Sequence, residues 1–353
     1  MALETRLTKR LGIRLPIFQA PMGGGPSTPA LAAAVSNAGG FGSLAGGYLT
    51  PAAIEAEIRA TRELTGAPFG VNLFALAEPP VPSNDAIDAA NRALDVYRDE
   101  LQIARGTRPA KFSERFEEQA AVILAEKPAV FSFTFGIPPR AWLDRFRAAG
   151  IVTMGTATNV AEARALRDAG VDVVCAQGAE AGGHRGTFLG TREEGMLGLF
   201  ALIPLIRAAV DLPIVAAGGI MNGGSIAAAL ALGADAAQLG TAFLLTPEAG
   251  TSAPYRLALQ ERERTTAITR SFSGRDARGI DNRFMHDVTA TLEYPYQNAL
   301  TRDIRAAAAK AGRSEFLSLW AGQAFALATE TPAAELVARL AAETERAIAR
   351  LAR

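Results

Sequence analysis

The chain has 353 residues, of which 49% are hydrophobic and 20% charged, a composition typical of a folded globular protein rather than a disordered one. Its 36 Lys and Arg residues balance its 36 Asp and Glu residues, so no excess of positive charge favours a nucleic-acid partner. One cysteine excludes an intramolecular disulfide, and with only two histidines it argues against a Cys/His metal site. We expect a metal-free protein of the reducing cytoplasm, built as about two domains or as one barrel of ~250 residues with an insertion.

The sequence also argues against a secretory signal and a membrane span. Charged residues interrupt the first 16 positions, which leaves no apolar stretch of the kind that a signal peptide requires. The most hydrophobic window, 226–245, contains Asp235 and Gln238, and a turn at Gly233 divides it into a helix and a strand. No membrane partner is therefore expected.

Eight short apolar runs predict β-strands. Gly39, Gly150, Gly170 and Gly233 each follow an Ala-rich run and precede an apolar one, which marks them as helix ends where a left-handed residue is needed. Thr28 followed by proline marks a helix start, because a hydroxyl caps the helix and proline suits its first position. The expected strands are residues 17–19, 42–44, 69–73, 129–133, 152–155, 173–177, 214–217 and 236–239.

Strands that alternate with helices and lack a polar face favour a closed (β/α)8 TIM barrel of the α/β class over an open sheet. Two stretches break the rhythm. The polar, proline-containing segment 78–118 predicts a helical insertion, and the segment 247–312, rich in Arg, Thr, Phe and Tyr, predicts a cap subdomain over the C-terminal face of the strands. We therefore expect a barrel over 1–246, the cap over 247–312, and C-terminal helices over 313–353 that pack on the barrel or on a second subunit.

Glycines follow the last two predicted strands, at the end where barrel enzymes place their chemistry. Gly218, Gly219 and Gly240 would let backbone amides approach a phosphate, and Thr241 would add a hydroxyl donor. The N-terminus of the next helix is expected to add partial positive charge. These glycines could instead only form turns, but their presence in both loops favours a phosphate site. No G-x-G-x-x-G or P-loop motif follows a strand, which argues against a Rossmann nucleotide site.

His184 is the candidate catalytic residue. It lies in a glycine-rich loop beyond the sixth predicted strand, and imidazole titrates near neutral pH, which suits proton abstraction. His286 has no such context and is expected to be structural. Cys175 lies within the strand, where a buried, inert thiol is the simplest interpretation. Asn72 and Gln177, at strand ends, could bind the edge of a flat heteroaromatic ring or could satisfy loop backbone.

Taken together, the motifs resemble those of the nitronate monooxygenase family, formerly called 2-nitropropane dioxygenases, and of its class I branch. The resemblance covers nearly the whole chain, and the combined pattern is specific although no single glycine cluster would be. It rests on residues 19–24, 27–29, 36–40, 42, 70–74, 177–186, 217–220 and 238–241.

The resemblance implies that the barrel binds FMN and oxidises alkyl nitronates with molecular oxygen to a carbonyl compound and nitrite. Oxidation would begin with transfer of one electron from the nitronate to the flavin, and propionate 3-nitronate, a toxic metabolite, would be the physiological substrate. His184 would take the α-proton of a neutral nitroalkane, a step that a preformed nitronate does not need. The residues expected to contact FMN are Ala20, Met22, Asn72, Gln177, Gly182, Gly218, Gly219, Gln238, Leu239, Gly240 and Thr241.

The predicted cap offers candidate contacts for a compact anionic substrate. Tyr hydroxyls or a cation would suffice for this purpose, and Tyr255, Tyr296, Arg275 and Lys310 are the candidates. A cap of this composition also needs such residues to fold. The expected partners are the small-molecule nitronate and O2, and the expected oligomeric state is a monomer or a homodimer.

Three other functions compete with nitronate oxidation. An FMN-dependent NAD(P)H:quinone or enoyl-thioester reductase would share the fold, the flavin and a loop like that of His184, whereas Arg185 and the segment 274–284 favour the nitronate group. Nucleotide oxidation through a covalent cysteine is disfavoured because the loop after strand six contains no cysteine. A flavin-binding protein without activity would be unaffected by His184→Asn.

Overall fold

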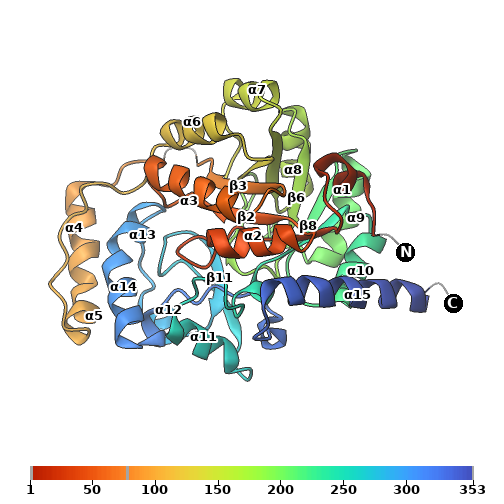
Figure 1. Cartoon of the computed structure of the whole chain (residues 1–353). Helices are drawn as coiled ribbons and strands as arrows, with labels where there is room; N and C mark the ends of the chain where they lie inside the picture. The colour runs from red at the N-terminus through yellow and green to blue at the C-terminus, as the bar shows by residue number, and fades with distance from the viewer. Residues whose placement is uncertain (1–2, 77–78, 352–353) are drawn as a thin grey trace.

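The computed structural model describes residues 3–76 and 79–351, and in this part of the chain eight parallel strands form the wall of a barrel (Figure 1). Neighbouring strands follow the order β1-β9-β8-β6-β5-β4-β3-β2. The wall closes between β1 and β2, because the Phe41 N–H donates to the Ile17 carbonyl at 2.9 Å and the Gln19 N–H donates to the Phe41 carbonyl at 2.9 Å. The predicted TIM barrel is thus confirmed. The strands are β1 (Ile17–Gln19), β2 (Gly42–Ala45), β3 (Phe69–Phe74), β4 (Val130–Thr134), β5 (Val152–Ala157), β6 (Val173–Gln177), β8 (Ile214–Ala217) and β9 (Ala236–Leu239).

In the described part of the chain eight helices surround the strands. Five of them directly follow their strand, whereas α6 comes after the two helices of the insertion and α9 comes after the short strand β7 (Gly183–His184). The eighth position, between α2 and α10, is filled by α15, so the cap is inserted between β9 and the last barrel helix. Helix starts and ends follow the sequence signals: Thr28 Oγ1 accepts the Leu31 N–H at 3.0 Å, and Gly39 adopts a φ of 95°. The helices are α2 (Pro29–Asn37), α3 (Pro51–Leu64), α6 (Phe116–Glu126), α7 (Arg140–Ala148), α8 (Val160–Asp168), α9 (Leu199–Ala209), α10 (Gly223–Ala231) and α15 (Ala333–Leu351).

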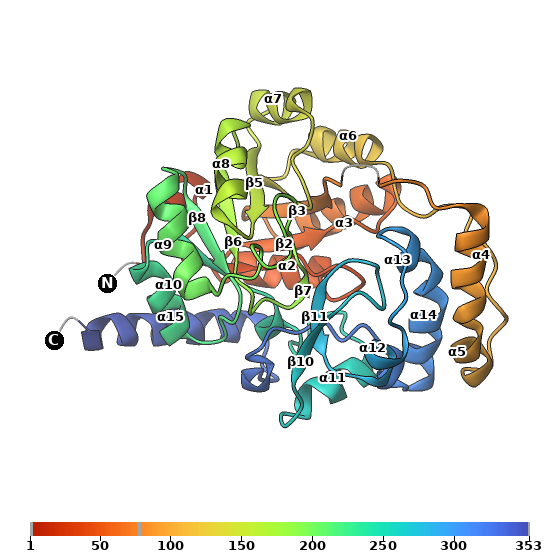
Figure 2. The same cartoon turned by 180° about the vertical axis from the view of Figure 1, so that it is seen from behind.

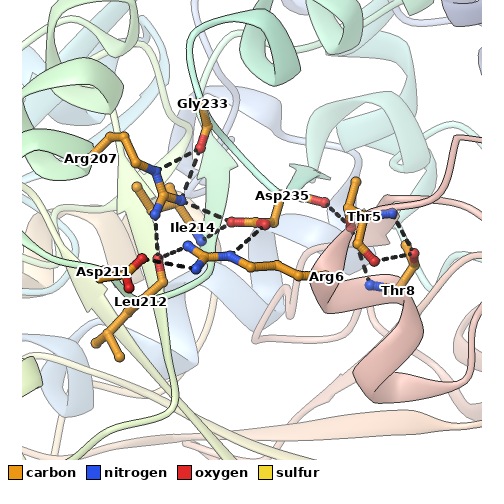
Figure 3. Close-up of polar contacts among 9 residues, drawn as sticks. All are labelled: Thr5, Arg6, Thr8, Arg207, Asp211, Leu212, Ile214, Gly233 and Asp235. Carbon is orange, nitrogen blue, oxygen red and sulfur yellow. Dashed lines mark hydrogen bonds and ion pairs between the residues drawn. The ribbon is translucent and has the colours of Figure 1, made fainter.

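The N-terminal helix α1 (Arg6–Leu11) covers the end of the barrel at which the strands begin. Leu7 and Leu11 pack into the lower core of the barrel, and Arg6 links the helix to the starts of β8 and β9 (Figure 3). Its Nε donates to Asp235 at 2.9 Å, and its Nη2 donates to the Leu212 carbonyl at 2.7 Å. Asp235 also accepts hydrogen bonds from the Arg207 guanidinium and from the Ile214 N–H, both at 2.9 Å. Chemistry is therefore confined to the opposite, open end.

Asp235→Ala is expected to lower the free energy of unfolding by about 2 kcal/mol, because two guanidinium groups and one backbone N–H lose their shared acceptor. Thermal unfolding followed by circular dichroism measures the change. Asp211→Ala is the matched control, since Asp211 binds the same Arg6 but its side chain is 100% exposed. Equal melting temperatures for the two variants would contradict this assignment.

The cap carries a small antiparallel sheet that includes a piece of the barrel loop. β10 (Thr266–Thr269) pairs with β11 (Ala277–Ile280), and β11 pairs with β7 (Gly183–His184), which comes from the loop after β6 (Figure 2). Ala277 lies opposite His184 in this pairing. The cap sheet is thereby fixed over the mouth of the barrel. Its helices are α11 (Ala253–Gln260), α12 (Arg283–Asp287), α13 (Tyr296–Leu300) and α14 (Arg302–Ala311).

The predicted insertion contains α4 (Asn84–Ala93) and α5 (Asp95–Glu100), and these helices lie beside α13 and α14 rather than beside the barrel (Figures 1 and 2). Arg98 holds them there. Its guanidinium is buried and donates to Asp303 at 2.7 Å and to the Leu300 carbonyl at 2.8 Å. The insertion therefore braces the cap. Residue 78, the first of the predicted insertion, lies outside the described residues, as do the outer ends of the predicted ranges 1–246 and 313–353.

The structure differs from the sequence prediction in the segment that precedes α15. Helix was expected from residue 314 onward, but residues 314–332 form only two short 3-10 turns, η2 (Ser314–Phe316) and η3 (Phe325–Leu327). The reason is tertiary: Gly322 donates its N–H to Thr241 and lies against the loop after β6, so this segment follows the barrel mouth. The hydrophobic window 226–245 forms the end of α10, β9 and the first residues after it, as predicted. Among the described residues, we find no helix long and apolar enough to cross a membrane.

Candidate active site

His184 lies at the barrel mouth, on the strand β7 that belongs to the cap sheet. Its Nε2 is 2.8 Å from Ser273 Oγ, and the Ser273 hydroxyl donates to the Arg275 carbonyl at 3.1 Å. The serine hydroxyl has one proton, so in the arrangement in which it donates to the Arg275 carbonyl the imidazole donates its Nε2–H to Ser273. In that tautomer Nδ1 carries the free lone pair, and no described residue makes a hydrogen bond to Nδ1.

Aromatic rings surround the imidazole. The ring centroids of Trp320, Phe135 and Tyr294 lie 5.4, 5.7 and 6.1 Å from that of His184. Burial among these rings, together with the positive charges of Arg275 and Arg305, lowers the pKa of His184 to about 3. The imidazole is thus neutral at physiological pH and can accept a proton at Nδ1.

The loops after β8 and β9 form an open cradle. Gly218 and Gly219 have φ values of 133° and 67°, which L side chains rarely adopt. A methyl group placed on Gly240 would meet nothing nearer than Ala20 Cβ at 3.5 Å, so the backbone there is accessible to a ligand. Thr241 Oγ1 accepts the Gly322 N–H at 3.0 Å, which leaves its own proton available for donation.

The helix N-terminus beside this cradle is that of α10, which begins after β8. Its first N–H, that of Gly223, donates to Glu343 of α15 at 2.9 Å. After β9 the chain forms only a 3-10 turn, η1 (Thr241–Phe243).

Gln238 provides the clearest sign of a missing partner. Its Nε2 lies 3.5 Å from the Cys175 sulfur, whereas its Oε1 is buried and has no hydrogen-bond partner among the described residues. An unpaired buried amide oxygen is costly, so a ligand that donates a hydrogen bond to it would be stabilised there. Asn72, also buried, donates to Ser132 Oγ at 3.0 Å.

Three of the residues predicted to contact a cofactor have visible structural roles. The Gln177 side chain donates to the His184 carbonyl at 3.0 Å and accepts the Gly186 N–H at 2.8 Å, so it satisfies loop backbone. Gly182 is required because any Cβ would lie 2.5 Å from the backbone of residues 321–322. The buried Leu239 accepts the Ala20 N–H at 2.8 Å through its carbonyl. These contacts shape the mouth whether or not the residues touch a ligand.

The candidate substrate contacts divide into near and distant ones. Arg275 stacks 4.1 Å above the Phe135 ring, next to His184. The Tyr255 hydroxyl donates to the Trp320 carbonyl and therefore supports the aromatic wall. Tyr296 is buried against Phe112, at a centroid distance of 4.9 Å.

Lys310 is exposed in the last turn of α14, whereas Arg302 and Arg305 of the same helix affect the ionisation of groups at the mouth. Five residues separate Lys310 from Arg305, which rotates the lysine by about 140° around the helix. Lys310 therefore lies on a different face of α14 from Arg305. The cations of α14 whose charges reach the mouth are Arg302 and Arg305, in addition to Arg275 from the loop before β11.

The serine and the aromatic partners of His184 were also missed. Ser273, Phe135, Tyr294 and Trp320 come from four separate segments that meet only in the folded chain. Only Phe135 had a local signal, because it directly follows β4 and thus stands at the active end of a barrel strand.

Cys175 is buried within β6, where burial raises the pKa of its thiol to about 12, as expected for an inert residue. We predict that iodoacetamide at pH 8 leaves the native protein unlabelled and that Cys175→Ser retains full activity. Mass spectrometry of intact native and urea-unfolded protein measures the labelling. Rapid modification of the native thiol would contradict this prediction and would favour a function in which Cys175 forms a covalent intermediate.

The comparisons with known proteins agree with this geometry. Residues 4–343 match the family model described as nitronate monooxygenase. A probable nitronate monooxygenase of Staphylococcus aureus strain Newman is 40% identical over 343 residues, which cover 96% of each chain. The structure also resembles the nitroalkane oxidase of Streptomyces ansochromogenes, with a TM-score of 0.91, 45% identity and coverage of 98% of this chain and 99% of that one.

More distant similarity links the fold to FabK from Thermotoga maritima, with a TM-score of 0.76 and 27% identity over 99% of this chain and 98% of that one. The family model and the Staphylococcus aureus relative span nearly the whole chain, including the barrel and the cap. The chain therefore belongs to the nitronate monooxygenase family of oxidoreductases.

Proposed function

We propose that the protein is an FMN-dependent enzyme that oxidises alkyl nitronates with O2 to a carbonyl compound and nitrite. The observation that carries this proposal is the neutral imidazole of His184, whose free Nδ1 lies at the mouth of a glycine-lined cradle. Membership of the nitronate monooxygenase family supports nitronate oxidation.

The residues at the mouth fit FMN. Gly218, Gly219, Gly240 and Thr241 would hold the phosphate through backbone amides and one hydroxyl. The unpaired Gln238 Oε1 would accept a hydrogen bond from the flavin ring, and Asn72, Ala20 and Met22 would line the same space. Bound FMN would supply the electron acceptor for the nitronate and the route by which electrons reach O2.

His184 acts as the base when the substrate is a neutral nitroalkane. Its Nδ1 accepts the α-proton, while the Nε2–H bond to Ser273 fixes the tautomer and the orientation of the ring. A substrate that is already a nitronate has lost this proton, so for such a substrate the imidazole only shapes the pocket. Ser273 is a positioning residue in this scheme.

The charges at the mouth favour an anionic substrate such as propionate 3-nitronate. Arg275 and Arg305 donate to backbone carbonyls and to Asn298, and neither forms an ion pair with a carboxylate in the described part of the chain. Arg302 and Tyr294 line a cavity of about 40 Å³ next to them. Buried cations without counter-ions attract an anion, and two negative groups on one small molecule would match two of these arginines.

The low pKa of His184 predicts a flat pH profile for neutral nitroalkanes. A base whose pKa is depressed to about 3 stays unprotonated as the pH falls from 8 to 5, so kcat/KM for nitroethane should not decline over this range. The ordinary histidine pKa would instead cause a loss near pH 6.5. Initial rates of nitrite release measure the profile, and a protonation step between pH 6 and 7 would show that the imidazole is solvated in the working enzyme.

The direct test of the proposal is oxygen uptake by the purified protein with propionate 3-nitronate, together with identification of the bound cofactor by mass spectrometry. We expect uptake with equivalent formation of nitrite, and FMN as the cofactor. The competing NAD(P)H:quinone or enoyl-thioester reductase is tested by anaerobic mixing with NADH and, separately, with the nitronate. Rapid bleaching by NADH and none by the nitronate would favour the reductase. Colourless protein that FMN cannot reconstitute would overturn the cofactor assignment.

Two further points belong to the proposal. The single buried cysteine fits the reducing cytoplasm as the site of action. We also propose that the protein works as a monomer or homodimer, because the cradle and His184 lie in one chain; light scattering after gel filtration tests the oligomeric state.

A further inference from the structure

A cavity of about 200 Å³ lies beside the barrel mouth, between the loop after β1, the start of α2 and the first turns of α3. It is separate from the small cavity that Arg302 lines, and the ring of Tyr48 belongs to the walls of both. Tyr48 is held in this dividing position by Gly23 on one side and by an edge-on contact with Phe74, at a centroid distance of 5.1 Å. The mouth thus has two distinct compartments.

The wall of the larger cavity offers a ligand mostly apolar surface. Met22, Ala45 and Leu49 contribute apolar side chains. Two of the three hydroxyl groups of the wall are already occupied, and the third is that of Tyr48. Ser27 Oγ accepts the Met22 N–H at 2.8 Å, and Thr28 Oγ1 donates to the Glu248 carbonyl at 2.6 Å. Few polar groups remain to hold a polar ligand there.

The one ionisable carboxylate of the wall, Glu57, also argues against an anionic occupant. Glu57 is half-buried, burial raises the pKa of its carboxyl, and no ion pair involves it among the described residues. No cation lines the larger cavity, whereas the smaller one is lined by Arg302 and by an ion pair between Lys111 and Glu114, which leaves Arg302 as its uncompensated charge. A nitronate is attracted to the smaller cavity and is disfavoured in the larger one.

Met22 connects the larger cavity to the cofactor cradle. A methyl group on Gly240 would lie 3.7 Å from Met22 Sδ, so the thioether stands between the cavity and the end of β9. Methionine is unbranched and flexible, and it can move aside for a small molecule at low cost. The cavity thus ends where the redox centre of the proposed function would begin.

We propose that this cavity is the route by which dioxygen reaches the cofactor, with Met22 as its inner gate. O2 is small, apolar and uncharged, and it must arrive while the nitronate occupies the compartment on the cap side. The inference rests on the proposed function, because O2 is the oxidant only if nitronates are oxidised as described above.

The test fills the cavity and measures two half-reactions separately. Ala45→Leu adds bulk to the wall, and Ser113→Leu is the matched control that adds the same side chain to the wall of the smaller cavity. We expect Ala45→Leu to lower kcat/KM for O2 several-fold at saturating nitronate, with no change in the anaerobic rate of flavin reduction by the nitronate. Ser113→Leu should leave kcat/KM for O2 unchanged and should raise KM for the nitronate.

Xenon provides a readout that does not depend on activity, since it occupies small apolar cavities in protein crystals. Crystals under xenon pressure should show density between Met22 and Leu49 in the wild type and none there in Ala45→Leu. The proposed route would be overturned by any of three results. These are unchanged O2 kinetics in Ala45→Leu, an equal fall in the rates of flavin reduction and of the reaction with O2, or a wild-type cavity without xenon. Failure of the wild type to oxidise any nitronate would instead overturn the proposed function, whatever the xenon density shows.

Discussion

His184→Asn is expected to lower kcat/KM for neutral nitroethane by a factor of about 10²–10⁴, the usual contribution of a positioned general base. The same variant should oxidise preformed ethylnitronate at nearly the wild-type rate, because that substrate has already lost its α-proton. Asparagine can still donate to Ser273, so the loop that carries residue 184 should keep its conformation. Oxygen uptake with the two forms of one substrate measures the split directly.

His286→Asn is the control for this prediction. Its imidazole is 68% exposed and pairs with Asp281 on the outside of the cap, so neither activity should change. Equal losses with nitroethane and ethylnitronate in His184→Asn would mean that His184 binds the substrate or shapes the pocket rather than removing a proton. No loss with either form would exclude it from the reaction.

Glu162→Ala should give the largest loss of stability, about 3–5 kcal/mol, because it removes a buried charged acceptor from four donors. The Glu162 carboxylate is fully buried at the start of α8. It accepts the Thr158 N–H at 2.5 Å and the Thr158 hydroxyl at 2.8 Å, and through its other oxygen the N–H groups of Phe188 and Leu189. It therefore ties the loop after β7 to the barrel.

Thermal unfolding and limited proteolysis test this role together. We expect a melting temperature several degrees lower and faster cleavage within residues 186–197, since the loop loses its internal anchor. Glu335→Ala, on the exposed side of α15, is the matched control and should change neither measurement. Lower stability without faster cleavage would show that Glu162 stabilises α8 alone.

The barrel could be predicted from the sequence because its signals are local. Each predicted strand lies within two residues of the observed one, since buried parallel strands are continuous apolar runs that glycines such as Gly170 and Gly233 delimit. The position of α15 as the eighth barrel helix could not be predicted in the same way, because the whole cap separates it from β9. Its amphipathic pattern indicates a helix but not the partner on which it packs.

The residues of the candidate site also divide into those with a local sequence signal and those without one. The cradle glycines directly follow β8 and β9, and His184 lies in the loop after β6, so strand prediction alone located them at the mouth. Ser273 and Trp320 reach His184 only through the folding of the cap, and no local pattern marks either residue. Composition shows that cations are present in the cap but not which face of α14 each one occupies, so Arg305 could not be distinguished from Lys310.

The pairing of β7 with β11 has a consequence for how this architecture can change. The imidazole and the glycine cradle belong to different sheets, so one part of the chain determines which group meets the substrate and another determines what is anchored beneath it. Replacement of β7 would exchange the side chain at position 184 and leave the loops after β8 and β9 unchanged. Under the proposed function, the same scaffold is therefore suited to diversify in chemistry through a few residues, without redesign of the loops that would hold FMN.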